Sequence, residues 1–107
     1  MSNFTLRDLE KRVHERAKAS AHASYTRRLL DRGAAHCAKK LGEEAIETVI
    51  AALAEDRHRL IAESADLLYH LLVVLQARGI AFAEVEAALA ERTAQSGLQE
   101  KAARPPA

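Results

Sequence analysis

The segment that decides the fold is residues 60–75, which read LIAESADLLYHLLVVL. Its apolar side chains point nearly all round a helix axis, a pattern typical of a helix that is buried on most sides. A chain of 107 residues offers few neighbours to bury such a helix. We therefore expect this helix to lie in the core of a helix-bundle homodimer.

The rest of the sequence predicts an all-α fold with four to five helices. Alanine occurs 23 times and leucine 14 times, and both favour helices. The expected helices cover about residues 6–19, 35–54, 57–78 and 82–94, with a short helical turn after Ser24. The predicted N-caps are Thr5, Ser24 and Asp56, and Gly79 is expected to end the helix before it. Residues 1–95 are expected to form one domain, and residues 96–107 a C-terminal tail.

Several classes of protein are disfavoured by composition. The single cysteine, Cys37, excludes an internal disulfide framework and a cysteine-rich zinc site. No uncharged apolar run of 18 residues occurs, and residues 1–10 show no apolar signal segment. We expect a cytoplasmic protein with no membrane partner.

The net charge of +1 conceals two halves of opposite sign. Residues 1–42 carry a net charge of +6, whereas residues 43–107 carry −5. Nucleic acid is disfavoured as a partner, because the acidic half accompanies the basic one and only four aromatic residues could stack on bases.

Two acid pairs form the most informative motif. Glu44 and Glu47 are three residues apart, as are Glu63 and Asp66, so each pair lies on one face of its helix. If the two helices are antiparallel, four carboxylates can converge. Such oxygen ligands suit Mg²⁺, or alternatively Mn²⁺. The alternative interpretation is an ordinary solvated acidic surface, and spacing alone does not decide between them.

Basic residues precede the acids on the same helix. Lys39 and Lys40 lie one turn before the glutamates, and three arginines lie in the preceding segment, Arg27, Arg28 and Arg32. These cations could form a rim that contacts phosphates, or could simply be solvated charges that form ion pairs such as Lys39–Glu43 and Lys40–Glu44. His70, four residues after Asp66, is either a group that supports the site or a hydrogen-bonded core residue.

The spacing Glu44-x-x-Glu47 followed by Glu63-x-x-Asp66 resembles the ExxE…ExxD signature of the all-α nucleotide pyrophosphohydrolases, the MazG-like and dUTPase-like enzymes. More specific are the flanking segments, which resemble the phosphoribosyl-ATP pyrophosphatase family. These segments are SYT at 24–26, KKLGEEAIE at 39–47, ESADLLYHLLV at 63–73 and SGLQEKAAR at 96–104. The resemblance runs from the first helix to Arg104.

The resemblance implies Mg²⁺-dependent hydrolysis of phosphoribosyl-ATP to phosphoribosyl-AMP and pyrophosphate, the second step of histidine biosynthesis. The expected assembly remains the homodimer inferred from the apolar helix, or a higher homo-oligomer. The implied catalytic residues are Glu43, Glu44, Glu47, Glu63 and Asp66. The implied metal ligands are Glu44, Glu47, Glu63 and Asp66, and the implied substrate contacts are Tyr25, Thr26, Arg28, Lys39, Lys40 and His70. The general base is either Glu43 or an unligated member of the four ligands.

Two alternatives remain open from the sequence. One is a house-cleaning enzyme of the same superfamily that hydrolyses other nucleoside or deoxynucleoside triphosphates. The other is a non-enzymatic helical dimerisation module.

Overall fold

The computed structural model describes residues 3–94, 97, 101–102 and 104–105, and this part of the chain is all-α, as predicted. Most of the expected tail, 96–107, lies outside these residues. Each predicted helix bound lies within two residues of the observed one. The helices are α1 (Leu6–Ala17), α2 (Tyr25–Asp31), α3 (Ala34–Leu53), α4 (Arg57–Ala77) and α5 (Phe82–Thr93).

Side-chain caps explain why three of these helices begin where they do. The Thr5 hydroxyl accepts from the backbone N–H of Asp8, whose carboxylate accepts in return, and this forms a capping box. Ser24 caps α2 and also donates to the carbonyl oxygen of Arg16 at 2.8 Å, so it ties α2 to the end of α1. Asp56 caps α4 in the same way. All three predicted N-caps are confirmed.

The buried core lies where α1 and α2 meet the second half of α4. Its buried apolar side chains are Val13, Leu29, Cys37, Leu72, Val73 and Phe82. Thr26 is also buried, and its hydroxyl hydrogen-bonds the Tyr69 hydroxyl at 2.5 Å. The Ser24-Tyr25-Thr26 segment therefore joins α2 to both α1 and α4.

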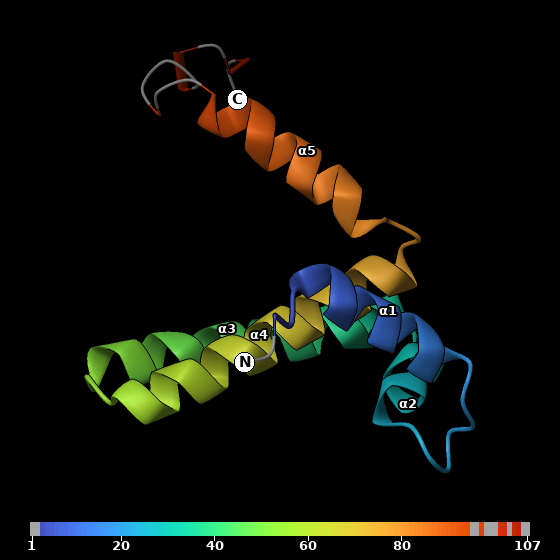
Figure 1. Ribbon diagram of the computed structural model, residues 1–107. Coiled ribbons are helices and arrows are strands. Elements are labelled where there is room, and N and C mark those ends of the chain that lie inside the picture. Colours follow the sequence, from blue (N-terminus) through green and yellow to red (C-terminus); the bar gives the residue numbers. More distant parts are fainter. Residues whose placement is uncertain (1–2, 95–96, 98–100, 103, 106–107) are drawn as a thin grey trace.

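Helices α3 and α4 form a long antiparallel hairpin that extends from this core (Figure 1). Residues 54–56 connect them, with Glu55 in the left-handed region at φ 57°. The Thr48 hydroxyl lies 2.8 Å from the carbonyl oxygen of Glu44 and 3.2 Å from that of Glu63. This contact sets Glu44 opposite Glu63, which decides the geometry of the site.

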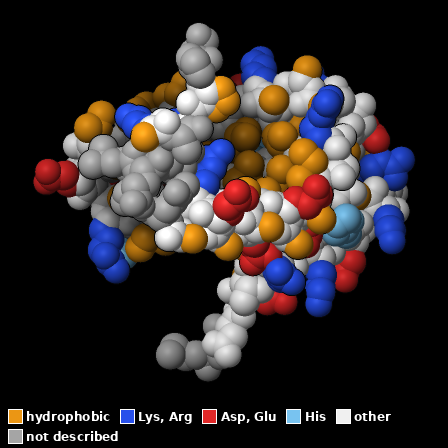
Figure 2. All heavy atoms as spheres, turned by 90° about the horizontal axis from the view of Figure 1, so that it is seen from above, with side chains coloured by type: hydrophobic (Ala, Val, Ile, Leu, Met, Phe, Trp, Pro, Cys, Tyr) orange, Lys and Arg blue, Asp and Glu red, His pale blue; other side chains and the backbone are white. Residues whose placement is uncertain are grey.

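A large apolar surface of the hairpin remains exposed in the single chain. On α3, Ile46 is 63% exposed and Leu53 is 78% exposed, although the apolar half of this helix suggests a core-facing stripe. On α4 the buried residues are His70, Leu72 and Val73. The expectation that α4 is buried on most sides is therefore not met within one protomer. Exposed hydrophobic side chains also occupy the middle of the face seen in Figure 2, bordered by charged ones.

Helix α5 turns away from the rest of the molecule after Gly79, whose φ is 68° (Figure 1). Its first turn is anchored, because Phe82 is buried and its backbone N–H donates to the Glu10 carboxylate at 2.7 Å.

By length and composition alone, α4 could cross a membrane. It carries two carboxylates and the ring of His70, and such groups are costly in hydrocarbon.

Candidate active site

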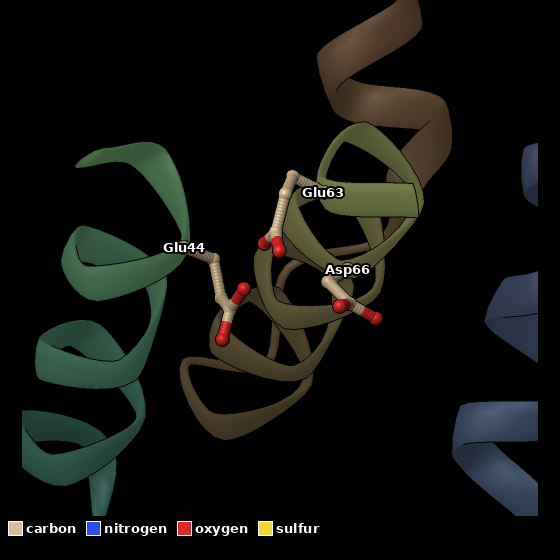
Figure 3. Close-up of side chains that lie close together, drawn as sticks. All are labelled: Glu44, Glu63 and Asp66. Carbon is tan, nitrogen blue, oxygen red and sulfur yellow. The ribbon is translucent and has the colours of Figure 1, made fainter. Parts of the chain in front are cut away.

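Three of the predicted acids converge between α3 and α4. Glu44 projects from α3, and Glu63 and Asp66 project from α4 (Figure 3). One carboxylate oxygen from each lies within 4.8 Å of the others. Glu44 and Glu63 are partly buried, whereas Asp66 is exposed. The convergence predicted from two acid pairs on antiparallel helices is therefore present for these three residues.

Glu63 lies at the electrostatic centre of this group. Partial burial raises the pKa of the Glu63 carboxyl above its ordinary value, and the negative charges of Glu44, Glu47 and Asp66 raise it further. In the part of the chain that is described, no lysine or arginine forms an ion pair with Glu44, Glu63 or Asp66. The hairpin therefore holds like charges together without a protein cation to neutralise them.

Glu47 lies close enough to affect Glu63 but faces a different partner. Its carboxylate accepts from the guanidinium of Arg59 at 3.0 Å and is not part of the group of three. Arg59 is absent from the residues predicted from sequence. It could have been found, because it lies four residues before Glu63 and therefore on the same face of α4.

The donor set fits a hard divalent cation. All the converging groups are carboxylates, which are the ligands that Mg²⁺ and Mn²⁺ prefer. Glu44, Glu63 and Asp66 could hold such an ion directly, and Glu47 could join them only by leaving Arg59.

The acid Glu43 lies outside the carboxylate group. It is exposed and accepts from the Lys40 ammonium group at 3.1 Å. That hydrogen bond lowers the pKa of Glu43 below its ordinary value and raises the pKa of Lys40. A carboxylate with a lowered pKa is a weaker base.

A basic pocket lies one turn before Glu44, toward the N-terminal end of α3. It has a volume of about 340 Å³. Its lining residues are Tyr25, Arg28, Leu29, Arg32, His36 and Lys40. Burial lowers the pKa of His36, and the nearby charges of Arg32, Lys39 and Lys40 lower it further, which marks a positively charged surrounding. Such a pocket can bind an anion.

Some of the residues predicted to contact the substrate line this pocket, and others do not. Tyr25, Arg28 and Lys40 line it, and Arg28 also donates to the carbonyl oxygen of Ala21 at 2.6 Å. Lys39 is exposed and does not line it. Arg32, which belongs to the basic segment identified from the sequence before the glutamates, also lines it. His36 lines it too and was not predicted, because only the approach of α2 to α3 encloses it.

Three rings connect this pocket to the acids. His70 is buried, and its ring packs edge-on against Tyr69 at 5.0 Å and Tyr25 at 6.3 Å between centroids. Its Nδ1 lies 2.7 Å from the carbonyl oxygen of Asp66; since a carbonyl only accepts, Nδ1 carries the proton. Nε2 is buried with no partner in the described part of the chain. Buried Thr26 contacts Tyr69, and this contact supports the rings.

The resulting arrangement joins an acidic end to a basic end. His36, Lys40 and Glu44 follow one another at four-residue spacing on α3 and therefore lie along one face. Asp66 and His70 run beside them on antiparallel α4. A ligand that carries several phosphates could span both ends. A cation held by the acids would contact some of its phosphates, and the basic side chains of the pocket would contact the others.

Comparison with known proteins gives a consistent result. The family model described as phosphoribosyl-ATP pyrophosphohydrolase matches residues 6–93. A Bradyrhizobium diazoefficiens protein named phosphoribosyl-ATP pyrophosphatase 1 is 64% identical over 104 residues, which cover 97% of this chain and 98% of the relative. A Nitrobacter hamburgensis protein named phosphoribosyl-ATP pyrophosphatase is 61% identical over 104 residues, 97% of each chain.

The repulsion at Glu63 predicts that Glu63→Gln stabilises the metal-free protein. The gain in melting temperature should be full above the raised pKa of Glu63, where that carboxyl is ionised. It should shrink as the pH falls through the raised pKa and vanish below the ordinary carboxyl value of 4.5, because the native carboxyl is then protonated. Thermal unfolding in EDTA between pH 4 and pH 8 measures this. Glu55→Gln, on the exposed connection, is the control and should change nothing.

Proposed function

The chain belongs to the phosphoribosyl-ATP pyrophosphohydrolase family. We propose that the carboxylates between its helices α3 and α4 form the magnesium site for the hydrolysis that gives this family its name. The reaction is hydrolysis of phosphoribosyl-ATP to phosphoribosyl-AMP and pyrophosphate, the second step of histidine biosynthesis. Membership of this family makes the enzyme interpretation preferable to a helical dimerisation module.

The observation that carries the proposal is the approach of Glu44, Glu63 and Asp66 to within 4.8 Å. Carboxylates repel one another, so a protein that keeps them together without a lysine or arginine offers a favourable site for another cation. These three residues would hold Mg²⁺, with Mn²⁺ as a substitute. When bound, the ion supplies positive charge to the phosphate oxygens and activates water for hydrolysis.

The chain's own cations and rings bind the rest of the substrate. Arg28, Arg32 and Lys40 offer N–H donors to phosphate oxygens in the pocket, and arginine matches these oxygens in a bidentate way. The exposed ring of Tyr25 lies at the pocket wall, where it can pack against the nucleoside. Lys39 adds charge near the pocket without lining it.

Hydrolysis breaks the α–β phosphoanhydride. Water adds at the α-phosphorus, the bond to the bridging oxygen breaks, and pyrophosphate leaves with the electron pair. A general base takes the proton of the water. We assign this role to a carboxylate of the acidic group rather than to Glu43, because Lys40 holds Glu43 ionised and lowers its basicity. Glu43 then positions Lys40.

We also propose that the enzyme is a homodimer or higher homo-oligomer in the cytoplasm. The exposed stripe of Ile46, Val49, Ile50 and Leu53 has the three- and four-residue spacing of one helix face. Contiguous apolar surface of this kind marks an interface. A second copy of the α3–α4 hairpin would cover this stripe and complete a four-helix bundle. The same contact would cover apolar side chains of α4, so a dimer interface explains the apolar composition of α4 without a membrane.

The activity prediction concerns Glu44. Glu44→Gln keeps the shape of the side chain but removes one charge at the metal. We expect kcat/KM for phosphoribosyl-ATP to fall by about 100-fold or more, beyond the range for groups that merely support a ligand. Release of pyrophosphate in saturating Mg²⁺ measures this, with Glu55→Gln as the control. Wild-type activity in Glu44→Gln, or faster hydrolysis of dATP than of phosphoribosyl-ATP by the native chain, would contradict the proposal.

The pocket prediction concerns Arg32. Arg32→Gln should raise KM for phosphoribosyl-ATP by about ten-fold or more, because a hydrogen bond to a charged group contributes about 1.5–3 kcal/mol. The value of kcat should change much less. The effect should weaken at high salt, which screens partly exposed charges. Arg57→Gln, at the far end of the hairpin, is the matched loss of one positive charge; an equal rise in its KM would argue against the pocket.

The assembly prediction concerns the apolar stripe. We expect the native chain to sediment as a dimer or larger species at micromolar concentration. Val49→Asp should shift it toward the monomer, because it places a charge in the buried interface. Ala21→Asp, in the exposed loop before α2, should leave the assembly unchanged. A stable monomer of the native chain in analytical ultracentrifugation would overturn the proposal.

A further inference from the structure

One carboxylate at the acidic site, that of Glu47, forms an ion pair with a basic side chain of the same chain. Arg59 donates to Glu47 at 3.0 Å, while Glu44, Glu63 and Asp66 have no arginine or lysine partner within the described residues. The backbone of Arg59 is fixed, because its N–H donates to the Asp56 cap at 3.1 Å. The Arg59 side chain therefore extends from a fixed first turn of α4, and its guanidinium lies at the edge of the acidic group.

The ion pair is half open to solvent. The Arg59 side chain is 42% exposed and that of Glu47 is 46% exposed. Pairs this exposed contribute little to stability, and their two long side chains can separate at low cost. A divalent cation held by three carboxylates can still replace the exposed guanidinium as the partner of Glu47, because it binds carboxylate oxygens directly and takes more than three oxygen ligands.

We propose that Arg59 is a positioning residue that holds Glu47 away from the other acids and releases it when a divalent cation binds. This inference rests on the proposed metal site. In the metal-free protein the pairing reduces repulsion by turning one of the four carboxylates toward a positive charge. On metal binding, Glu47 exchanges Arg59 for the cation and becomes an additional ligand. Arg59 therefore competes with the metal for Glu47.

The test measures Mn²⁺ binding to the full-length, EDTA-stripped protein by calorimetry, without substrate. Arg59→Gln should tighten Mn²⁺ binding by about two- to five-fold, the equilibrium equivalent of an exposed ion pair. The matched control is Arg27→Gln. Arg27 forms an ion pair with Asp31 at 2.8 Å on α2, with side chains 41% and 47% exposed. This control should leave Mn²⁺ affinity unchanged.

A double-mutant cycle separates release of Glu47 from simple charge repulsion. If Arg59 acts through Glu47, Arg59→Gln should have no effect on Mn²⁺ affinity in the Glu47→Gln background. The same tightening in both backgrounds would overturn the inference, and so would weaker or unchanged binding in Arg59→Gln alone. Failure of the native protein to bind Mn²⁺ would instead overturn the proposed metal site.

A second measurement applies if Glu47→Gln binds Mn²⁺ too weakly to complete the cycle. Arg59→Gln should lower the melting temperature in EDTA, where the ion pair exists, but not in saturating Mn²⁺, where Glu47 has left it. An equal loss in both conditions would contradict the exchange.

Discussion

Repulsion between the carboxylates of Glu44, Glu63 and Asp66 is the constraint on which the rest of the structure depends. A helix pair that holds these charges within 4.8 Å must be stabilised elsewhere. The packing of α1 and α2 against the second half of α4 supplies that stability at one end of the hairpin. Thr48, which contacts the backbone of both Glu44 and Glu63, keeps the register beside the acids.

The fold was largely predictable because its signals are local. Thr5, Ser24 and Asp56 cap helices through hydrogen bonds to residues three positions on, and Gly79 takes a positive φ after α4. The burial of α4 was not predictable within one chain. Periodicity shows which side chains are apolar but not whether a neighbour or a second protomer covers them. The exposed Ile61 and Leu68 illustrate this gap.

The site was predictable only in part, for the same physical reason. Three-residue spacing places Glu44 and Glu47 on one face of α3, but it does not determine which partner each carboxylate meets. Arg59 decides that for Glu47, and it belongs to another helix. The basic pocket depends on how α2 approaches α3, so His36 was missed, whereas Lys40 and the basic segment that contains Arg32 were found. The opposite charges of the two halves of the sequence meet along one face of α3.

The three-residue connection between α3 and α4 has a consequence for the order of folding. Glu44 and Glu63 meet by closing a short loop, whereas Tyr25 and His70 meet only after α2 reaches α4 across a much longer stretch of chain. Contacts between residues near in sequence form sooner than distant ones. We therefore expect the acidic half of the site to form early, within the hairpin, and the pocket to assemble around it later. A cation available while the hairpin forms would favour the native pairing before the substrate pocket exists.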